Sequence, residues 1–268
     1  HWWFVARRQI ICSLIRQLVP PHRNPARQAT IIDVGCGTGA NLAALASDYH
    51  AVGIDTSAEA IRMAAERFLG VDFRAGYAPE DLGDCFGEAQ LVMVNDVLEH
   101  VPDDFRLLTS LLAAMRRGAY CLITVPADVR LWSVHDETFG HYRRYDLPRL
   151  SRLWRDLPVE TVVCSHFNAR LYPLIRGLRT WHRWRGKSAG RAGTDFQMPS
   201  RPVNWLLQQI FAGERQSLGR LLEDPSCRTY PRGVSLLAVL RRGPGPLATL
   251  AKPADVAADA YDPQARVC

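Results

Sequence analysis

Three glycines at alternate positions follow a short apolar run, and this feature restricts the fold of the chain more than any other. Residues 31–39 read Ile-Ile-Asp-Val-Gly-Cys-Gly-Thr-Gly. The apolar run is typical of a buried strand, and glycines directly after a strand let the backbone turn sharply and approach a ligand closely. Asp55 ends the next apolar run, 20 residues after Gly35, where an acid can bind both hydroxyls of a ribose. The pattern predicts a half-fold that binds a nucleoside cofactor.

Asp33 discriminates between nucleoside cofactors. Gly35, Gly37 and Ala40 also satisfy the loose dinucleotide pattern G-x-G-x-x-G/A, so the glycines alone leave a nicotinamide-dependent oxidoreductase open. A carboxylate two residues before the first glycine would repel a pyrophosphate, whereas it would attract an ammonium and a sulfonium. Asp33 therefore favours S-adenosylmethionine, which carries both positive groups and no phosphate.

Residues 32–39 resemble the first motif of the class I S-adenosylmethionine-dependent methyltransferases, D/E-x-G-x-G-x-G. The resemblance implies that Asp33 orients the methionine end of S-adenosyl-L-methionine, that the glycines lie beneath it, and that Asp55 holds the ribose. The cofactor-binding residues predicted on this basis are Asp33, Gly35, Cys36, Gly37, Gly39, Asp55, Thr56, Tyr77, Ala78, Asn95 and Asp96.

Alternating strand and helix patterns predict an α/β fold with a doubly wound, mostly parallel sheet. The predicted strands are residues 30–34, 51–54, 71–74, 91–94, 120–125, 159–164 and 235–240; the main predicted helices are 3–19, 40–47, 58–68, 103–115 and 147–155. The resemblance implies a seven-stranded, Rossmann-like sheet with an antiparallel last strand. Residues 1–164 and 234–242 are expected to form the methyltransferase core, residues 165–233 a helical cap or lid insertion, and residues 243–268 a flexible tail.

Composition places the chain among soluble, cytoplasmic proteins. A hydrophobic content of 47% supports a packed core, and no run of about 18 apolar residues predicts a membrane span. We find no secretory signal. The seven cysteines are scattered without a C-x-x-C pair, which favours reduced thiols and argues against a zinc or disulfide framework.

The segment after residues 91–94 carries the first candidate catalytic group. Residues 95–102 read Asn-Asp-Val-Leu-Glu-His-Val-Pro, and they resemble the N/S-x-V-L-E-H-V stretch of small-molecule methyltransferases, including ubiquinone-pathway O-methyltransferases. The resemblance makes His100 a candidate general base; the alternative is a structural histidine that caps the turn. A second interpretation gives Asp96, Glu99 and His100 one side of a divalent metal site, although the interpretation adopted here uses no metal.

Residues 131–145 carry the other candidate histidines. The segment resembles the H-D-E-x-x-G-H-x-R-R-Y stretch of a bacterial subgroup of these methyltransferases. It follows the carboxyl end of a predicted strand, where an acceptor pocket is expected. His135 with Asp136 offers a base and its orienting group, and His141 is a third catalytic candidate.

Arg143, Arg144 and Tyr145 of the same segment are the candidate acceptor-binding residues, because arginines can grip an anionic acceptor. The alternative is that the arginines form salt bridges with Asp136 and Glu137 and fix the loop.

Tyr77 departs from the pattern of the family that this chain resembles. The family commonly has an acid at this position, which binds the adenine amino group, so we expect Tyr77 to stack or pack against the adenine ring instead.

A basic amphipathic helix is predicted over residues 170–185. No acid occurs from residue 161 to 194, and Leu171, Leu174, Ile175 and Leu178 recur at helical spacing among arginines. A lid packed over the acceptor pocket is the favoured interpretation, contact with an anionic membrane surface or a lipid-linked acceptor is the second, and nucleic acid is disfavoured.

These features together predict transfer of a methyl group to a small-molecule or lipid-linked acceptor. O-methylation with a histidine base is favoured, because a hydroxyl acceptor profits from deprotonation. The alternatives are a nicotinamide-dependent oxidoreductase and a catalytically silent cofactor-binding module. The expected location is the cytoplasm, with peripheral contact to the inner membrane face as the second interpretation.

Overall fold

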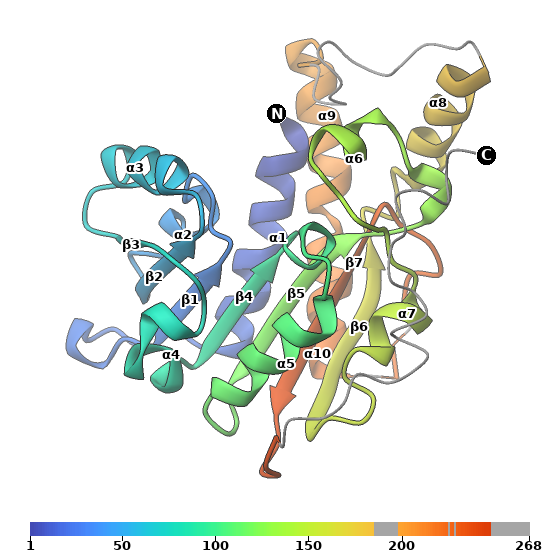
Figure 1. The fold of residues 1–268 in the computed structure, drawn as a ribbon. Coiled ribbons are helices and arrows are strands. Elements are labelled where there is room, and N and C mark those ends of the chain that lie inside the picture. The colour runs from blue at the N-terminus through green and yellow to red at the C-terminus, as the bar shows by residue number, and fades with distance from the viewer. Residues whose placement is uncertain (185–197, 225, 228, 248–268) are drawn as a thin grey trace.

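A single seven-stranded sheet forms the centre of the molecule (Figure 1). The computed structural model describes residues 1–184 and 198–247, apart from residues 225 and 228. The strand order is β3-β2-β1-β4-β5-β7-β6, and β7 runs antiparallel to both of its neighbours. The strands are β1 (Thr30–Val34), β2 (His50–Asp55), β3 (Asp72–Ala75), β4 (Leu91–Asn95), β5 (Tyr120–Pro126), β6 (Val159–Phe167) and β7 (Ser235–Arg242). The predicted fold class is confirmed.

Helices cover both faces of this sheet. α4 (Asp84–Glu88), α5 (Asp104–Ala114) and α7 (Leu147–Arg152) lie in front of it in Figure 1, and α1 (Trp2–Leu18), α9 (Arg201–Ala212) and α10 (Glu214–Glu223) lie behind it. The other helices are α2 (Ala40–Ala43), α3 (Ala58–Arg67), α6 (Val134–Thr138) and α8 (Tyr172–Trp184). The chain order reverses between β1 and β4, so a ligand crevice is expected beyond the carboxyl ends of these two strands.

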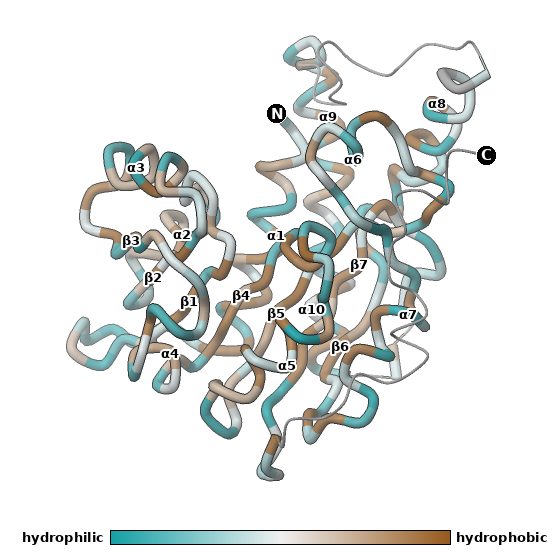
Figure 2. The backbone as a smooth tube through the Cα atoms, viewed as in Figure 1, coloured by the Kyte–Doolittle hydropathy of each residue, from teal (hydrophilic) through white to brown (hydrophobic). Residues whose placement is uncertain are grey.

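The central strands β4 and β5 are apolar because both of their faces are buried, whereas β3 and β6 are partly exposed. In β4, Val92 and Val94 pack into the core on the side of α5, and Leu91 and Met93 pack into the core on the side of α1. Figure 2 shows hydrophobic residues gathered along the central strands. A strand buried on both faces reads as a continuous apolar run, and for that reason the sequence predicted these strands within a few residues.

The helices between β6 and β7 lie in two different parts of the molecule. α9 and α10 pack along α1, and the Trp2 backbone N–H donates to Asn204 Oδ1 at 2.8 Å. α8 instead stands above the carboxyl edge of the sheet, close to α6 in Figure 1. Residues 185–197 of the predicted cap and residues 248–268 of the predicted tail lie outside the described residues.

Two further sequence expectations concern cysteines and membranes. The six cysteines within the described residues are all free thiols. Across residues 1–184 and 198–247, each helix is too short or too polar to cross a membrane.

Candidate active site

The glycine motif forms a tight turn between β1 and α2. Gly35, Gly37 and Gly39 all have positive φ angles, of 70°, 53° and 74°. A Cβ on Gly35 would also come within 2.6 Å of Val97 Cγ2, so a side chain is excluded there by space as well as by conformation. The turn thus leaves an exposed stretch of backbone at the carboxyl end of β1, as a cofactor loop requires.

Asp55 holds this turn from the end of β2. Its Oδ2 accepts the Gly37 backbone N–H at 2.8 Å, and its Oδ1 accepts the Ser57 backbone N–H at 2.9 Å. The carboxylate is half-buried and bridges the glycine loop to the start of α3. The contact of Asp55 with the cofactor ribose stays a prediction.

Asp33 lies at the end of β1 with only 1% of its surface exposed. Burial raises its pKa to about 7, although Arg7 and the Asn95 amide act in the opposite direction. Asn95 Nδ2 donates to Asp33 Oδ1 at 3.5 Å. Such a buried carboxylate is stabilised in its ionised form when a cation binds beside it.

Arg7 is a site residue that sequence reasoning missed. It reaches from α1 to the ends of β4 and β5, where its guanidinium pairs with Asp96 at 2.7 Å and donates to Thr124 Oγ1 at 2.5 Å. Its spacing to Ile10, Ile11 and Leu14 places it on the apolar face of α1. A charged residue on a buried face needs a partner, so this spacing was the signal that could have revealed it.

Asp96 occupies a strained backbone position beside this pair. Its φ angle is 55°, a conformation that residues other than glycine adopt at a cost of order 1–3 kcal/mol. The strain turns its carboxylate toward Arg7 and Thr124, with Asp96 Oδ1 at 3.2 Å from Thr124 Oγ1. Asp96 was predicted to bind the cofactor, and in this structure it is engaged by Arg7.

The loop after β3 contains an acid, Asp81, that was not among the residues predicted from sequence. Tyr77 is 69% exposed, and its backbone N–H donates to Asp81 Oδ2 at 2.7 Å. Asp81 thereby folds back beneath the Gly76–Ala78 segment. The contact of Tyr77 with adenine stays a prediction.

Asp136 organises the segment that was predicted as a loop. The segment contains the short helix α6, and Asp136 closes its capping box by accepting the Ser133 backbone N–H at 2.9 Å. The same carboxylate contacts His141 Nδ1 at 2.9 Å and pairs with Arg144 at 2.7 Å. Burial alone would raise the pKa of Asp136, but His141, Arg144 and the backbone donor hold it well below its usual range.

The pairing differs from the sequence expectation in one respect. Asp136 was expected to orient His135, and it orients His141 instead, because the turn after α6 brings residue 141 back over the helix. The His135 ring lies against Phe139, with the ring centroids 4.6 Å apart. Both histidines face the same cavity.

The predicted acceptor-binding arginines have structural partners. Arg143 is 4% exposed, pairs with Asp104 at 3.1 Å and donates to the Val101 and Pro102 carbonyls. Tyr145 is buried and donates its hydroxyl to Asp104 at 2.8 Å. We therefore do not carry Arg143 and Tyr145 into the acceptor site; Arg144 lines the cavity but is bound to Asp136. The salt-bridge alternative is correct for Arg144, which pairs with Asp136, and wrong in the partner of Arg143, which is Asp104.

Glu99 and His100 line the cavity from a short helical turn after β4, with Glu99 buried and His100 partly exposed. Burial and the neighbouring His141 lower the pKa of His100, so the ring is neutral at physiological pH. Glu99 is 1% exposed, and neither of its carboxylate oxygens has a hydrogen-bond partner within the described residues. Burial and the nearby Asp96 raise the pKa of Glu99 well above its usual range.

These groups open into one cavity of about 620 Å³. Its polar end lies at the carboxyl ends of β4 and β5. Its other walls come from α1, α8 and α9 and are mainly apolar, although Arg179 of α8 also lines the cavity. The polar lining includes Asp96, Glu99, His100, His135, His141 and Arg144, and the apolar lining includes Trp2, Trp3, Phe4, Leu171, Leu174, Ile175, Leu178 and Leu207.

Comparison with known proteins places the chain in a family. Residues 4–182 match the methyltransferase domain family. The chain belongs to this family. The match covers more than half of the chain and begins and ends close to the elements that build the site. It confirms the predicted class of S-adenosylmethionine-dependent methyltransferase and its cofactor, and it overturns the oxidoreductase alternative.

Curated relatives of this methyltransferase domain include trans-aconitate 2-methyltransferases. The enzyme of Azoarcus sp. is 31% identical over 138 residues, which cover 48% of this chain and 45% of the relative. The Deinococcus radiodurans enzyme is 33% identical over 104 residues, which cover 37% of this chain and 39% of the relative. The chain therefore spans less than half the length of these relatives.

Solved structures share the fold at low identity. The plantazolicin methyltransferase BamL has a TM-score of 0.54 at 14% identity, with 88% of this chain and 85% of that chain covered. The [4+2]-cyclase SpnF has a TM-score of 0.52 at 16% identity, with 90% and 82% covered. Because one neighbour is named a methyltransferase and the other a cyclase, the fold alone does not define the reaction.

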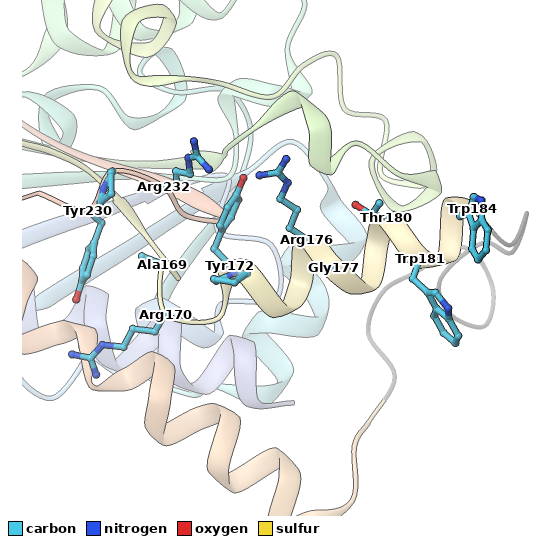
Figure 3. Close-up of a pocket in the computed structure, with 12 residues that line it drawn as sticks. Ala169, Arg170, Tyr172, Arg176, Gly177, Thr180, Trp181, Trp184, Tyr230 and Arg232 are labelled. Carbon is cyan, nitrogen blue, oxygen red and sulfur yellow. The ribbon is translucent and has the colours of Figure 1, made fainter.

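A second hollow of the methyltransferase domain lies on the outer side of α8. It measures about 810 Å³ and contains none of the candidate catalytic residues. Figure 3 shows Arg176 and Arg232 close to Tyr172, and Trp181 and Trp184 toward the far end of α8. α8 thus presents leucines and Arg179 to the cavity, and Arg176, Trp181 and Trp184 to this hollow. Its role as a lid stays a prediction.

Replacing Asp55 by alanine is expected to weaken S-adenosylhomocysteine binding by roughly 1–3 kcal/mol, because the ribose hydroxyls lose a charged acceptor. Isothermal titration calorimetry measures the change. Asp72→Ala, at the start of the adjacent β3, is the matched control and should bind as the wild type does. Unchanged affinity in Asp55→Ala would show that the ribose lies elsewhere.

Cofactor affinity is expected to rise with pH up to about 7, the pKa of Asp33 in the unliganded structure. The cofactor ammonium favours the ionised form of Asp33, so the complex holds fewer protons than the free protein. Below the pKa of Asp33, the affinity for the cofactor therefore rises by at most about tenfold per pH unit. Titrations of S-adenosylhomocysteine from about pH 5 to 8 test this. Asp33→Asn should bind weakly at every pH; an unchanged slope in that variant would contradict the assignment.

Proposed function

We propose that this chain transfers a methyl group from S-adenosylmethionine to a hydroxyl oxygen of a small acceptor that also carries an apolar portion. The observation that supports this best is the cavity itself, which joins a histidine cluster to apolar walls. The histidine cluster lies beyond the carboxyl ends of β4 and β5, at the same edge of the sheet as the cofactor loop that follows β1. An acceptor with a polar reacting group and an apolar remainder fits this arrangement.

The chemistry assigned to the site is an in-line displacement. The acceptor oxygen forms a bond to the methyl carbon while the carbon–sulfur bond breaks, and the electron pair stays on sulfur. Because the sulfonium is already reactive, most of the acceleration comes from alignment, which can contribute about 7–11 kcal/mol. The cofactor loop and the cavity walls supply that alignment.

His141 is the base that the geometry favours. Its Nδ1 donates to Asp136, which leaves Nε2 with the lone pair that accepts the acceptor's proton. His100 has a lowered pKa and lies edge-to-face with His141, with the ring centroids 4.6 Å apart. His135 stands farther off, with its centroid 6.3 Å from that of His141. All three sequence candidates thus gather at one end of the cavity, and His141 is the one that Asp136 orients.

The apolar walls argue for an acceptor different from a tricarboxylate. The curated relatives are named for trans-aconitate, and such a substrate needs several cationic partners. Two arginines line the cavity, and both have partners: Arg144 is neutralised by Asp136, and Arg179 donates to the Leu131 carbonyl. Trp2, Trp3 and the α8 leucines are apolar. We therefore place an aromatic or alkyl group of the acceptor against α1 and α8.

The mouth of the cavity supports a lipid-linked acceptor. Leu174 and Leu178 are 52% and 47% exposed, and Trp181 and Trp184 continue the same end of α8. Apolar side chains that remain in water beside arginines suit contact with an anionic lipid surface. The acceptor chain would then enter along α8 from that surface.

A homologous series of alkyl-substituted phenols tests the proposal. kcat/KM is expected to rise by up to about fourfold per methylene until the cavity is filled, from about 0.8 kcal/mol per buried methylene. Ile175→Asn should flatten the series, and Leu69→Asn, at a site 89% exposed and remote from the cavity, should not. The phenols with the longest alkyl chains are also assayed as substrates in vesicles of anionic lipid. Preference for trans-aconitate, with no dependence on chain length, would overturn the proposal.

A further inference from the structure

Three possible metal ligands converge at the polar end of the cavity. One ligand atom each of Glu99, His100 and His141 lies within 4.8 Å of the others. Glu99 and His100 come from the turn after β4, and His141 comes from the segment after α6. The grouping is therefore a product of tertiary folding, and only its first two members are neighbours in sequence.

One of the two histidines is already oriented as a ligand. Asp136 accepts the Nδ1 proton of His141, so Nε2 carries the free lone pair. A metal-binding histidine characteristically donates its second nitrogen to a carboxylate or a carbonyl, and His141 does so here. The His100 ring lies edge-to-face with that of His141, with the ring centroids 4.6 Å apart.

Glu99 supplies the independent observation. Its side chain is 1% exposed and lines the cavity, yet neither oxygen has a hydrogen-bond partner within the described residues. Buried carboxylate oxygens are almost always satisfied by a donor or an ion, so a pair of orphan oxygens beside two imidazole lone pairs indicates a missing partner. Asp96, the other acid nearby, is held by Arg7 at 2.7 Å and is left out of the ligand set.

We propose that Glu99, His100 and His141 bind a first-row divalent transition-metal cation. Two imidazoles and one carboxylate on one side of an ion suit Zn²⁺, Fe²⁺ or Co²⁺ and do not suit Mg²⁺ or Ca²⁺, which prefer oxygen ligands. All three side chains line the cavity, so a bound cation would be within reach of an acceptor. This set differs from the one suggested by sequence, since His141 replaces Asp96.

The cation would deepen the proposed function, on which its catalytic consequence rests. An acceptor hydroxyl bound to a divalent cation has a lower pKa and is fixed beside the methyl group. His141 then acts as a ligand, and the hydroxyl proton passes to solvent. Cation binding itself requires no turnover and is measured separately.

Cobalt titration provides the test. The full chain, without a polyhistidine tag and treated with a chelator, is titrated with Co²⁺ and followed by its visible d–d absorption; calorimetry with Zn²⁺ gives the stoichiometry. One equivalent is expected to bind. Glu99→Gln and His100→Gln should weaken binding by at least about tenfold to a hundredfold, the loss typical even of outer metal partners. His135→Gln and His166→Gln are matched controls and should bind Co²⁺ as the wild type does.

The outcomes separate the two proposals. Thermal unfolding and S-adenosylhomocysteine binding establish that each variant is folded. If the wild type binds no cation, if Glu99→Gln and His100→Gln both bind normally, or if the Co²⁺ spectrum shows thiolate charge transfer, the metal site is overturned. Cation binding at these residues together with failure of every hydroxyl acceptor would sustain the metal site and refute the proposed reaction.

Discussion

Asp136→Ala is expected to lower the free energy of unfolding by about 3–5 kcal/mol, because it leaves the buried Arg144 guanidinium without its counter-ion. The loss should appear as a lower midpoint in urea or guanidinium unfolding. The capping box of α6 is lost at the same time, so the segment that carries His135 and His141 should also become more mobile.

The neighbouring acid provides the control for this prediction. Glu137→Ala removes an exposed carboxylate from the same helix and should change stability by less than about 0.5 kcal/mol. The pKa of Asp136 is held below its unfolded value, so its contribution is complete at neutral pH and disappears only in strong acid, as the pH falls through the depressed value. Equal stability of the two alanine variants would mean that the Arg144 pair contributes little.

His141→Gln is expected to reduce kcat by about 10²–10⁴-fold, the range for loss of a positioned proton acceptor. The same loss is expected if His141 binds a cation, because the acceptor oxygen then loses its anchor. Cofactor affinity should stay close to that of the wild type, and stability should fall by only about 1 kcal/mol for the lost Asp136 hydrogen bond. Single-turnover kinetics with saturating acceptor measures the effect.

Two other histidine variants are the comparisons for His141→Gln. His50→Gln, at the amino-terminal end of β2, should leave kcat unchanged. His135→Gln should cost less than His141→Gln, because the carboxylate of this segment orients His141. Near-normal turnover in His141→Gln, with the true acceptor, would exclude His141 as base and as essential ligand.

The parts of the fold that follow local rules were predictable from sequence. The central strands, such as β4 and β5, were found because they are apolar on both faces, and helices such as α3 and α7 were found because Ser57 and Asp146 cap them. The glycine motif and Asp33 led directly to the cofactor loop. In each case neighbouring residues alone determine the conformation.

The acceptor side was less predictable because it depends on pairings across the chain. The Asp136–His141 contact needs the turn after α6, and the capping box formed by Ser133 and Asp136 was not recognised in a segment taken as a loop. The Arg7–Asp96 pair joins residues that lie 89 positions apart, and no local pattern reports it. Sequence therefore named the acceptor-side histidines but could not assign their partners.

The support of α1 by α9 and α10 has a consequence for how the site is completed. Arg7 reaches Asp96 from a helix whose outer side rests on residues 201–223. These residues are synthesised after the whole family-matched stretch, residues 4–182. A nascent chain that has exposed only that stretch already contains the glycine loop and the histidines, yet the helix that carries Arg7 still lacks its support. The site is thus completed by segments that lie before and after its motifs in the sequence, so a shortened chain that keeps every motif but lacks residues 201–223 would also lack the packing that fixes Arg7.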